Sequence, residues 1–250
     1  GVQMIGAELE WAETKGEGIK VGLLDSGMPV HPDIKVRESK NFSNSHSVVD
    51  YHGHATHTAG IICANGAIKG VAPGVELYCG KVLNELNEGY YEWLIKGIDW
   101  CVGKGVDVIS MSLGGGKSSD ALYDAIKRAY NAGIILVAAA GNEGQRGTNY
   151  PARYKEVISV AAVDIAKKAA VFSSVGPDVE LAAAGVKAYS TYLDGTYAEM
   201  SGTSMACPHI AGAAALMQAK AKIRYKELLD PELVRCSMGL YADDLGERGR

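Results

Sequence analysis

The chain has 250 residues, enough for one large domain or two small ones. Its residues are 47% hydrophobic and 22% charged, as in ordinary globular proteins, and the net charge of −4 gives no reason to expect nucleic acid or an anionic membrane as partner. No apolar run approaches the ~20 residues of a membrane span. The five cysteines are scattered and lack CxxC spacing, so we expect buried free thiols rather than disulfides or a zinc knuckle.

Five short apolar runs predict buried strands, and they span residues 19–26, 75–83, 106–113, 133–140 and 156–163. Their continuous apolar character is typical of a parallel sheet that is covered on both faces. Residues 90–105 and 120–133 have helical periodicity, and each segment closes with a glycine at a C-cap position. Residues 203–222 predict a third, more buried helix.

Strands that alternate with helices at this spacing predict a doubly wound α/β fold. The sequence contains no repeat, low-complexity tract or linker, so we expect a single domain over residues 1–250. Sites in such folds lie at the carboxyl ends of the strands. That rule selects the positions after Leu24, after Leu113 and after Ala140, together with the loop before Ser204.

Residues at these positions can perform chemistry. Asp25 ends the first strand, where a buried carboxylate is costly unless it is paired, although Asp-Ser-Gly is also a common turn. Histidines 52, 54 and 57 follow in "DYHGHATH". A zinc site is another interpretation of these three imidazoles, but no nearby Glu or Cys completes a ligand set.

A serine hydrolase needs a nucleophile, a base and a group that orients the base, and Ser204, His54 and Asp25 supply them. The order Ser, acid, His of the α/β-hydrolases fails, because no acid lies between Ser204 and the one later histidine, His209. Asn142, after the strand at 133–140, has a side-chain amide that suits an oxyanion, although Asn in a glycine-flanked loop is often only a turn residue.

Four segments together resemble the subtilisin family of serine proteases, the subtilases. These are "LLDSG" for the aspartate, "HATHTAG" for the histidine, "AAAGNEG" for the oxyanion donor and "SGTSMACPHIAG" for the serine. The resemblance runs from near Gly1 to about Gly239. It implies a three-layer fold with a mostly parallel central sheet flanked by helices on both faces. It also implies a serine endopeptidase that uses Asp25, His54, Ser204 and Asn142 and needs no catalytic cofactor.

Some positions depart from the family pattern. Ala55 stands where the family has glycine after the catalytic histidine, which leaves a catalytically silent pseudoprotease with a binding or regulatory role as the alternative. Residues 63–73 are shorter than the family's calcium loop. The ending "DDLGERGR" lacks the family's last strand and helix and is compatible with a trimmed C-terminus. A third alternative is a nucleotide-binding α/β protein that uses residues 113–120 as a phosphate loop, but this segment lacks the GxxxxGK(S/T) and GxGxxG spacings.

The resemblance also implies a structural calcium or monovalent cation. Asp178, with Glu180 near, would supply carboxylate oxygen, and Ala152, Tyr154 and Val157 would supply backbone carbonyls, although a solvated acidic turn is an equal alternative. Asp33 in "HPD" matches the ligand aspartate of the family's other site. Its partners look incomplete.

Substrate is expected to be a protein or peptide that binds as an extended strand, because free backbone groups at a cleft edge favour strand addition. Ser112, Leu113 and Gly114 would form one edge of the cleft, and the segment near residues 88–91 the other. We expect the following residues to line two side-chain pockets: Ala139, Gly141 and Asn149 for the residue before the scissile bond, and Tyr91, Leu94 and Leu113 for a residue three positions upstream. Glu143 near the rim would modestly favour a basic or polar residue.

The cysteines, the slight acidity and the opening "GVQMIGAELEW" resemble the intracellular branch of the family and favour a cytoplasmic enzyme. Secretion after removal of a precursor segment is the alternative. In either case a pro-segment would be a candidate inhibitor that occupies the cleft.

Overall fold

The computed structural model describes residues 1–144 and 147–246. The helices are α1 (Ala7–Glu10), α2 (His54–Cys63), α3 (Tyr91–Lys104), α4 (Asp120–Asn131), α5 (Thr203–Tyr225) and α6 (Pro231–Tyr241), with a short 3-10 turn at Leu193–Gly195. The strands are β1 (Lys20–Asp25), β2 (Val36–Asn41), β3 (Glu76–Lys81), β4 (Val108–Met111), β5 (Ile135–Ala139), β6 (Val157–Val163), β7 (Leu181–Ala184), β8 (Ala188–Thr191) and β9 (Tyr197–Met200).

Strands β1 to β7 form one parallel sheet in the order β2-β3-β1-β4-β5-β6-β7. All five strands that the sequence predicts lie in this sheet, and their side chains are almost entirely buried. The order reverses direction at β1, which places its carboxyl end at a topological switch point, where α/β folds build their sites.

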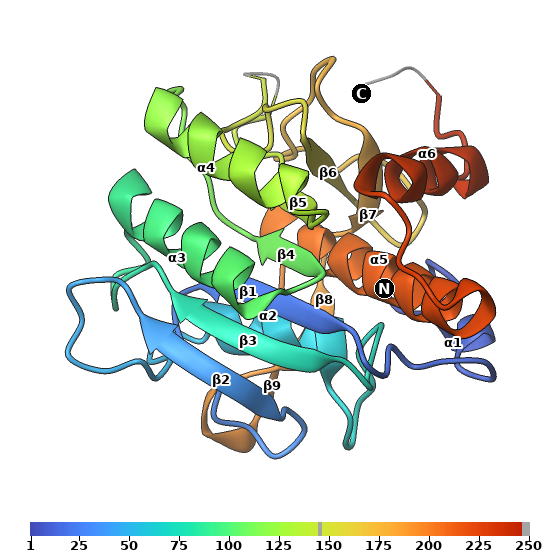
Figure 1. Cartoon of the computed structure of the whole chain (residues 1–250), viewed down its shortest axis with the longest axis horizontal. Coiled ribbons are helices and arrows are strands. Elements are labelled where there is room, and N and C mark those ends of the chain that lie inside the picture. The colour runs from blue at the N-terminus through green and yellow to red at the C-terminus, as the bar shows by residue number, and fades with distance from the viewer. Residues whose placement is uncertain (145–146, 247–250) are drawn as a thin grey trace.

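Helices cover both faces of the sheet (Figure 1). Helices α3 and α4 pack side by side on one face, against β1, β3 and β5, and enclose one hydrophobic core. Helices α2 and α5 pack on the other face, where α5 crosses β4 to β7 and a second core forms. The predicted three-layer α/β architecture is therefore confirmed.

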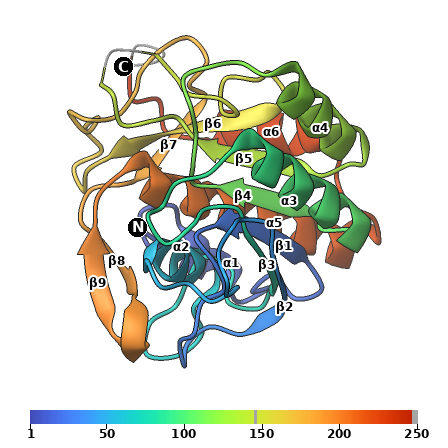
Figure 2. The same ribbon diagram turned by 90° about the vertical axis from the view of Figure 1, so that its left-hand side faces the viewer.

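The antiparallel hairpin β8–β9 stands apart from the central sheet (Figure 2). It is attached to α2 by His57, whose Nε2 lies 3.0 Å from the carbonyl oxygens of Ala188 and Ala198. Burial lowers the pKa of His57 to about 4, so the ring is neutral at pH 7 and serves as a donor to the hairpin. His57 is thus a structural residue and does not join the histidine and aspartate described below.

Four thiols lie inside the protein, those of Cys63, Cys79, Cys101 and Cys207, while Cys236 on α6 is exposed. Burial raises the pKa of Cys63 to about 12 and that of Cys207 to about 11. Over residues 1–144 and 147–246, every helix is too short or too polar to cross a bilayer.

Candidate active site

Asp25 and His54 form a buried pair at the carboxyl end of β1. Asp25 is the last residue of the strand and is 1% exposed, and its Oδ1 lies 2.7 Å from Nδ1 of His54, the first residue of α2. The same carboxylate accepts from the backbone N–H of Ser26 at 2.6 Å and from the Thr58 hydroxyl at 3.0 Å. Because these donors satisfy the buried charge, the carboxylate stays fixed against the imidazole.

The environment of His54 adjusts its basicity. Burial by itself would lower the pKa of the ring, but the charge of Asp25 and the hydrogen bond to it outweigh burial, and Asp50 adds a smaller contribution. The net effect raises the pKa of His54 above its ordinary value. With Asp25 on Nδ1, the Nε2 atom is the one left to exchange a proton with a substrate or nucleophile.

Ser204 is the second residue of α5, so the positive end of the helix dipole lies at its backbone N–H. Pro208, four residues later, has no N–H and leaves the Ser204 carbonyl without its helical donor. The Ser112 hydroxyl, just after β4, donates to that carbonyl at 2.8 Å, and the Ser204 hydroxyl donates to the Ser112 carbonyl at 3.2 Å. This reciprocal pair joins the helix start to the strand end.

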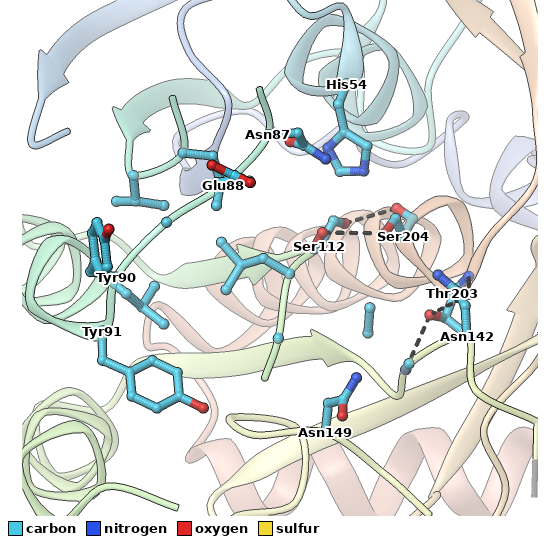
Figure 3. A pocket seen from close by; sticks show the side chains of 18 of the residues that line it. His54, Asn87, Glu88, Tyr90, Tyr91, Ser112, Asn142, Asn149, Thr203 and Ser204 are labelled. Atoms are coloured by element: carbon cyan, nitrogen blue, oxygen red, sulfur yellow. Dashed lines mark hydrogen bonds between the residues drawn. The ribbon is translucent and has the colours of Figure 1, made fainter. Parts of the chain in front are cut away.

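The side chains of His54 and Ser204 face the same cavity (Figure 3). Among the hydrogen bonds of the described residues, none joins them, since the Ser204 hydroxyl donates to Ser112 instead. Without substrate, such catalytic hydrogen bonds are often long and tighten only when the reacting complex forms.

Asn142 lies on the cavity wall after β5, and its orientation is fixed. Its Oδ1 accepts from the Thr203 backbone N–H at 2.9 Å and from the Thr203 hydroxyl at 3.1 Å. Asn142 lines the cavity, and its Nδ2 amine has no partner among the hydrogen bonds of the described residues, so it keeps its capacity to donate. Thr203 was not expected from the sequence, although a threonine before the candidate serine is a common helix-start residue.

A cavity of about 450 Å³ runs along the carboxyl edge of the sheet. It is lined by all eight residues that the sequence suggested for substrate contact, Tyr91, Leu94, Ser112, Leu113, Gly114, Ala139, Gly141 and Asn149. Residues 87–90 also line the cavity, and Figure 3 shows Asn87 and Glu88 from this segment. The arrangement brings together the residues that the separate motifs predicted.

Glu143 is held at the end of the cavity near Asn149. The Asn149 amide donates to both carboxylate oxygens, at 3.2 and 3.1 Å, and the Ser174 hydroxyl donates to one of them at 3.0 Å. Asn149 thus anchors a carboxylate at the cavity wall. A carboxylate in this place attracts a cationic side chain.

Comparison with known proteins identifies the family. The profile of the subtilase family, Peptidase S8, matches residues 16–240. The chain belongs to the subtilase family. This subtilase is 46% identical to subtilisin DY of Bacillus licheniformis, over 88% of this chain and 84% of that protein. It is 43% identical to an intracellular serine protease of Paenibacillus polymyxa, over 93% and 77% of the two chains, and 45% identical to a subtilisin of Bacillus pumilus, over 82% and 78%. It is accordingly a serine endopeptidase.

The acidic segment that suggested a cation site has cationic neighbours in this subtilase. Arg153 Nε lies 3.3 Å from Asp178 Oδ2, to which the Thr148 hydroxyl also donates at 3.1 Å. Arg235, on α6, forms a bidentate pair with the Glu180 carboxylate and donates to the Lys155 carbonyl. A guanidinium therefore pairs with each carboxylate, at Oδ2 of Asp178 and at both oxygens of Glu180, and offsets the negative charge that would favour a cation bound together with the carbonyls of Ala152, Tyr154 and Val157.

Asp33 is satisfied by neutral donors. Its Oδ2 accepts from the Tyr197 hydroxyl at 2.8 Å and from the Ile68 backbone N–H at 3.2 Å. Within the described ranges, no group of three Asp, Glu, His or Cys side chains is arranged to hold a metal ion. The short loop at residues 64–70 packs directly on the Asp33 carboxylate, so Asp33 does not fit a calcium ligand in this chain.

Proposed function

We propose that this subtilase hydrolyses peptide bonds through an acyl-enzyme on Ser204, with His54 as general base and acid, Asp25 as its orienting group and Asn142 as oxyanion donor. The observation that carries the proposal is the Asp25–His54 hydrogen bond of 2.7 Å at the wall of the cavity that Ser204 also faces.

A single peptidase domain over residues 1–250 is part of the proposal. Residues 247–250, on which the suggestion of a trimmed terminus partly rests, lie outside the described residues.

The reaction proceeds in two halves. The Ser204 oxygen attacks the scissile carbonyl carbon while its proton passes to Nε2 of His54, and the resulting oxyanion accepts hydrogen bonds from Asn142 Nδ2 and the Ser204 backbone N–H. The C–N bond then breaks, and the amine leaves with the proton from His54. Water attacks the ester with His54 again as base, and Ser204 recovers its proton as the acid product leaves.

The rival is the pseudoprotease suggested by Ala55. In the structure Ala55 is helical and buried, its N–H donates to the Ser26 hydroxyl at 2.9 Å, and the neighbouring His54 keeps its bond to Asp25. A fluorophosphonate probe separates the two functions, because it reacts only with an activated serine. We expect stoichiometric labelling of Ser204, located by peptide mass mapping; an unlabelled, folded protein would favour the pseudoprotease.

The substrate is a protein or peptide whose backbone adds as an extended strand beside residues 112–114, with residues 87–91 along its other edge. The apolar side chains of Tyr91, Leu94 and Leu113 take an upstream hydrophobic residue. The residue before the scissile bond enters between Ala139, Gly141 and Asn149. The same strand-binding edge would accept a pro-segment as an intramolecular inhibitor.

Glu143 predicts a preference for a basic residue before the scissile bond. In matched peptides that differ only there, we expect Arg or Lys to give kcat/KM about fivefold above Glu, since the side chain is solvent-accessible and the attraction is worth about 1 kcal/mol. Glu143→Gln should remove the difference. The preference should also shrink as salt rises from 0.05 to 0.5 M. Equal rates for Arg and Glu peptides at low salt would contradict this account.

Asn142 predicts a specific loss in the chemical step. Asn142→Leu should lower kcat by about 10²–10³-fold with little change in KM, the magnitude known for the corresponding asparagine of subtilisin itself. Steady-state kinetics on a chromogenic peptide measure it. Thr203→Val, which removes the hydroxyl donor to Asn142 Oδ1 but keeps the backbone donor, should cost much less. A kcat within threefold of wild type in Asn142→Leu would remove Asn142 from the mechanism.

The arginine pairs predict stability without a bound cation. Adding EDTA or 5 mM CaCl₂ should leave the melting temperature within 1 °C, because Arg153 and Arg235 already offset the charges of Asp178 and Glu180. Arg235→Gln should lower the free energy of unfolding by about 1 kcal/mol, or the melting temperature by about 2–4 °C. Scanning calorimetry measures both. A calcium-dependent rise in the wild type would revive the cation site.

We also propose that this subtilase is located in the cytoplasm, because it is similar to the Paenibacillus protease that is named intracellular. Fractionation of the producing cells with an antibody to this chain tests it. Recovery in the culture medium would favour the secreted alternative.

A further inference from the structure

Asp50 is a buried carboxylate close to the catalytic pair that the proposed mechanism does not use. It is 3% exposed and accepts five hydrogen bonds. Its Oδ1 accepts from the Ser26 hydroxyl at 2.9 Å and from the backbone N–H groups of His52 and Gly53 at 3.0 and 2.9 Å. Its Oδ2 accepts from the backbone N–H and the hydroxyl of Thr56 at 2.8 and 2.7 Å.

These bonds organise the first turn of α2, which begins with His54. The N-terminal N–H groups of a helix have no partner within the helix and need one from outside. Asp50 supplies it for Gly53 and Thr56. The Ser26 hydroxyl supplies it for Ala55, at 2.9 Å, while it donates its own proton to Asp50. Asp50 and Ser26 together thus accept hydrogen bonds from the backbone N–H groups on both sides of His54 in the chain, those of His52, Gly53, Ala55 and Thr56.

The same residues hold the end of β1, which carries Asp25. Ser26 follows Asp25 directly, and the segment that ends in Asp50 is bonded to Met28 through its backbone. Lys81 on β3, fully buried, donates to the carbonyls of Ser26 at 2.7 Å and Val49 at 3.1 Å. The segment that carries Asp25 and the segment that leads to His54 are therefore attached to one another through Asp50, Ser26 and Lys81.

We infer that Asp50 is a positioning residue that fixes the His54 imidazole against Asp25 and toward the cavity, with the Ser26 hydroxyl as the link between them. The inference rests on the proposed function, since it assigns His54 the role of base. A carboxylate suits this place because one group accepts from five donors at the positive end of a helix dipole. The side-chain amide of an asparagine could not accept all five hydrogen bonds, because its NH₂ group would face other N–H and O–H donors.

Asp50 also adds negative charge near His54. The titratable groups that face the ring are Asp25 from β1, Asp50 and His52 from the segment before α2, and His57 one turn further along α2. Both carboxylates favour the protonated ring. Removing the Asp50 charge should therefore move the acid limb of kcat/KM to lower pH, a change that a purely structural residue would not produce.

The test compares Asp50→Asn with Ser26→Ala and with a distant control. We expect Asp50→Asn to lower kcat by about 10²-fold with KM within twofold, the loss typical of a misplaced reacting group, and to move the acid limb to lower pH. Ser26→Ala keeps the charge and should lower kcat less, with the limb unmoved. Asp107→Asn removes a partly buried carboxylate that accepts from Lys20 N at 2.7 Å at the opposite end of β1. It should leave kcat unchanged.

The assays are run at equal intervals below each variant's melting temperature, so that a general loss of stability is matched. If Asp50→Asn keeps kcat within threefold, or loses no more than Asp107→Asn, the inference is wrong. If Asp50→Asn does not fold, Ser26→Ala and Thr56→Val decide: unchanged kcat in both overturns the inference. The rate of fluorophosphonate labelling distinguishes failure of the positioning role from failure of the proposed function. A labelled wild type with an equally fast Asp50→Asn rejects only the positioning role, whereas an unlabelled wild type rejects the proposed function.

Discussion

Ser204→Ala lowers kcat by about 10⁶-fold, and His54→Ala lowers it by about as much, magnitudes known for subtilisin itself. The double variant loses little more, because the two residues act as one unit: without the nucleophile there is no proton for the base to accept. What remains comes from the Asn142 amide, the Ser204 backbone N–H and substrate binding. Steady-state kinetics on a chromogenic peptide, with enzyme from a protease-deficient host, measure the loss.

The matched control is Ser159→Ala. Ser159 is a fully buried serine on β6 whose hydroxyl has no partner among the described residues, so its removal should leave kcat within twofold of wild type. Additive losses in the Ser204–His54 double variant would contradict a shared mechanism. Activity of Ser204→Ala within 10²-fold of wild type, with the probe still bound, would place the nucleophile elsewhere.

Asp25→Asn lowers kcat by about 10⁴-fold while the fold persists, in line with the effect known for the aspartate of subtilisin itself. The amide can hydrogen-bond to Nδ1, but it favours the wrong tautomer and does not stabilise the imidazolium. The loss should be smaller than that of Ser204→Ala, because the base and nucleophile are still present. Equal losses in the two variants would instead indicate that Asp25→Asn disrupts the site.

The pH dependence gives a second measure of the same change. Catalysis needs neutral His54, so kcat/KM of the wild type should fall as pH drops through the pKa of that ring, which Asp25 and Asp50 raise above 6.5 in spite of burial. In Asp25→Asn the largest raising influence is gone while burial still lowers the pKa. The acid limb should therefore move to lower pH. A limb that stays in place would separate the observed titration from His54.

The sequence predicted those elements whose pattern is set by burial alone. The five central strands are mostly apolar because helices cover both faces, and α5 is mostly apolar because it packs on the sheet. Strand β2, "VRESKN", was missed because it is an edge strand with polar exposed positions. Strand β7, "LAAA", was missed because alanine favours strands only weakly. Helix α6 had a signal, Asp230 before Pro231, that predicts a capped helix start.

At the candidate site, the sequence predicted residues that line the cavity and not the residues that hold them in place. In the sequence Thr203 looks like an ordinary helix-start residue and Asp50 like an ordinary loop residue. Their contacts with Asn142 and with α2 form only in the folded chain. The arginine partners of the proposed cation ligands went unpredicted for the same reason. Nothing near Glu180 in the sequence indicates that Arg235, 55 residues later, forms an ion pair with it.

The cysteines carry less information about compartment than their number suggested. Four are buried, and burial raises the pKa of Cys63 and Cys207 far above neutral pH, so these thiols stay protonated and poorly reactive in reducing and oxidising surroundings alike. The compartment has to be decided by fractionation rather than by composition.

Pro208 affects how substrate binding is coupled to the conformation of Ser204. Because it supplies no N–H, the Ser204 carbonyl takes its hydrogen bond from Ser112, and the Ser204 hydroxyl returns one to the Ser112 carbonyl. In the proposed mechanism, the backbone edge that receives the substrate strand and Ser204 are thus thermodynamically linked through two hydrogen bonds. A strand that adds beside Ser112 changes the free energy of each Ser204 rotamer, and by reciprocity each rotamer changes the affinity for the strand. Occupancy of the cleft and readiness of the nucleophile then become one equilibrium rather than two.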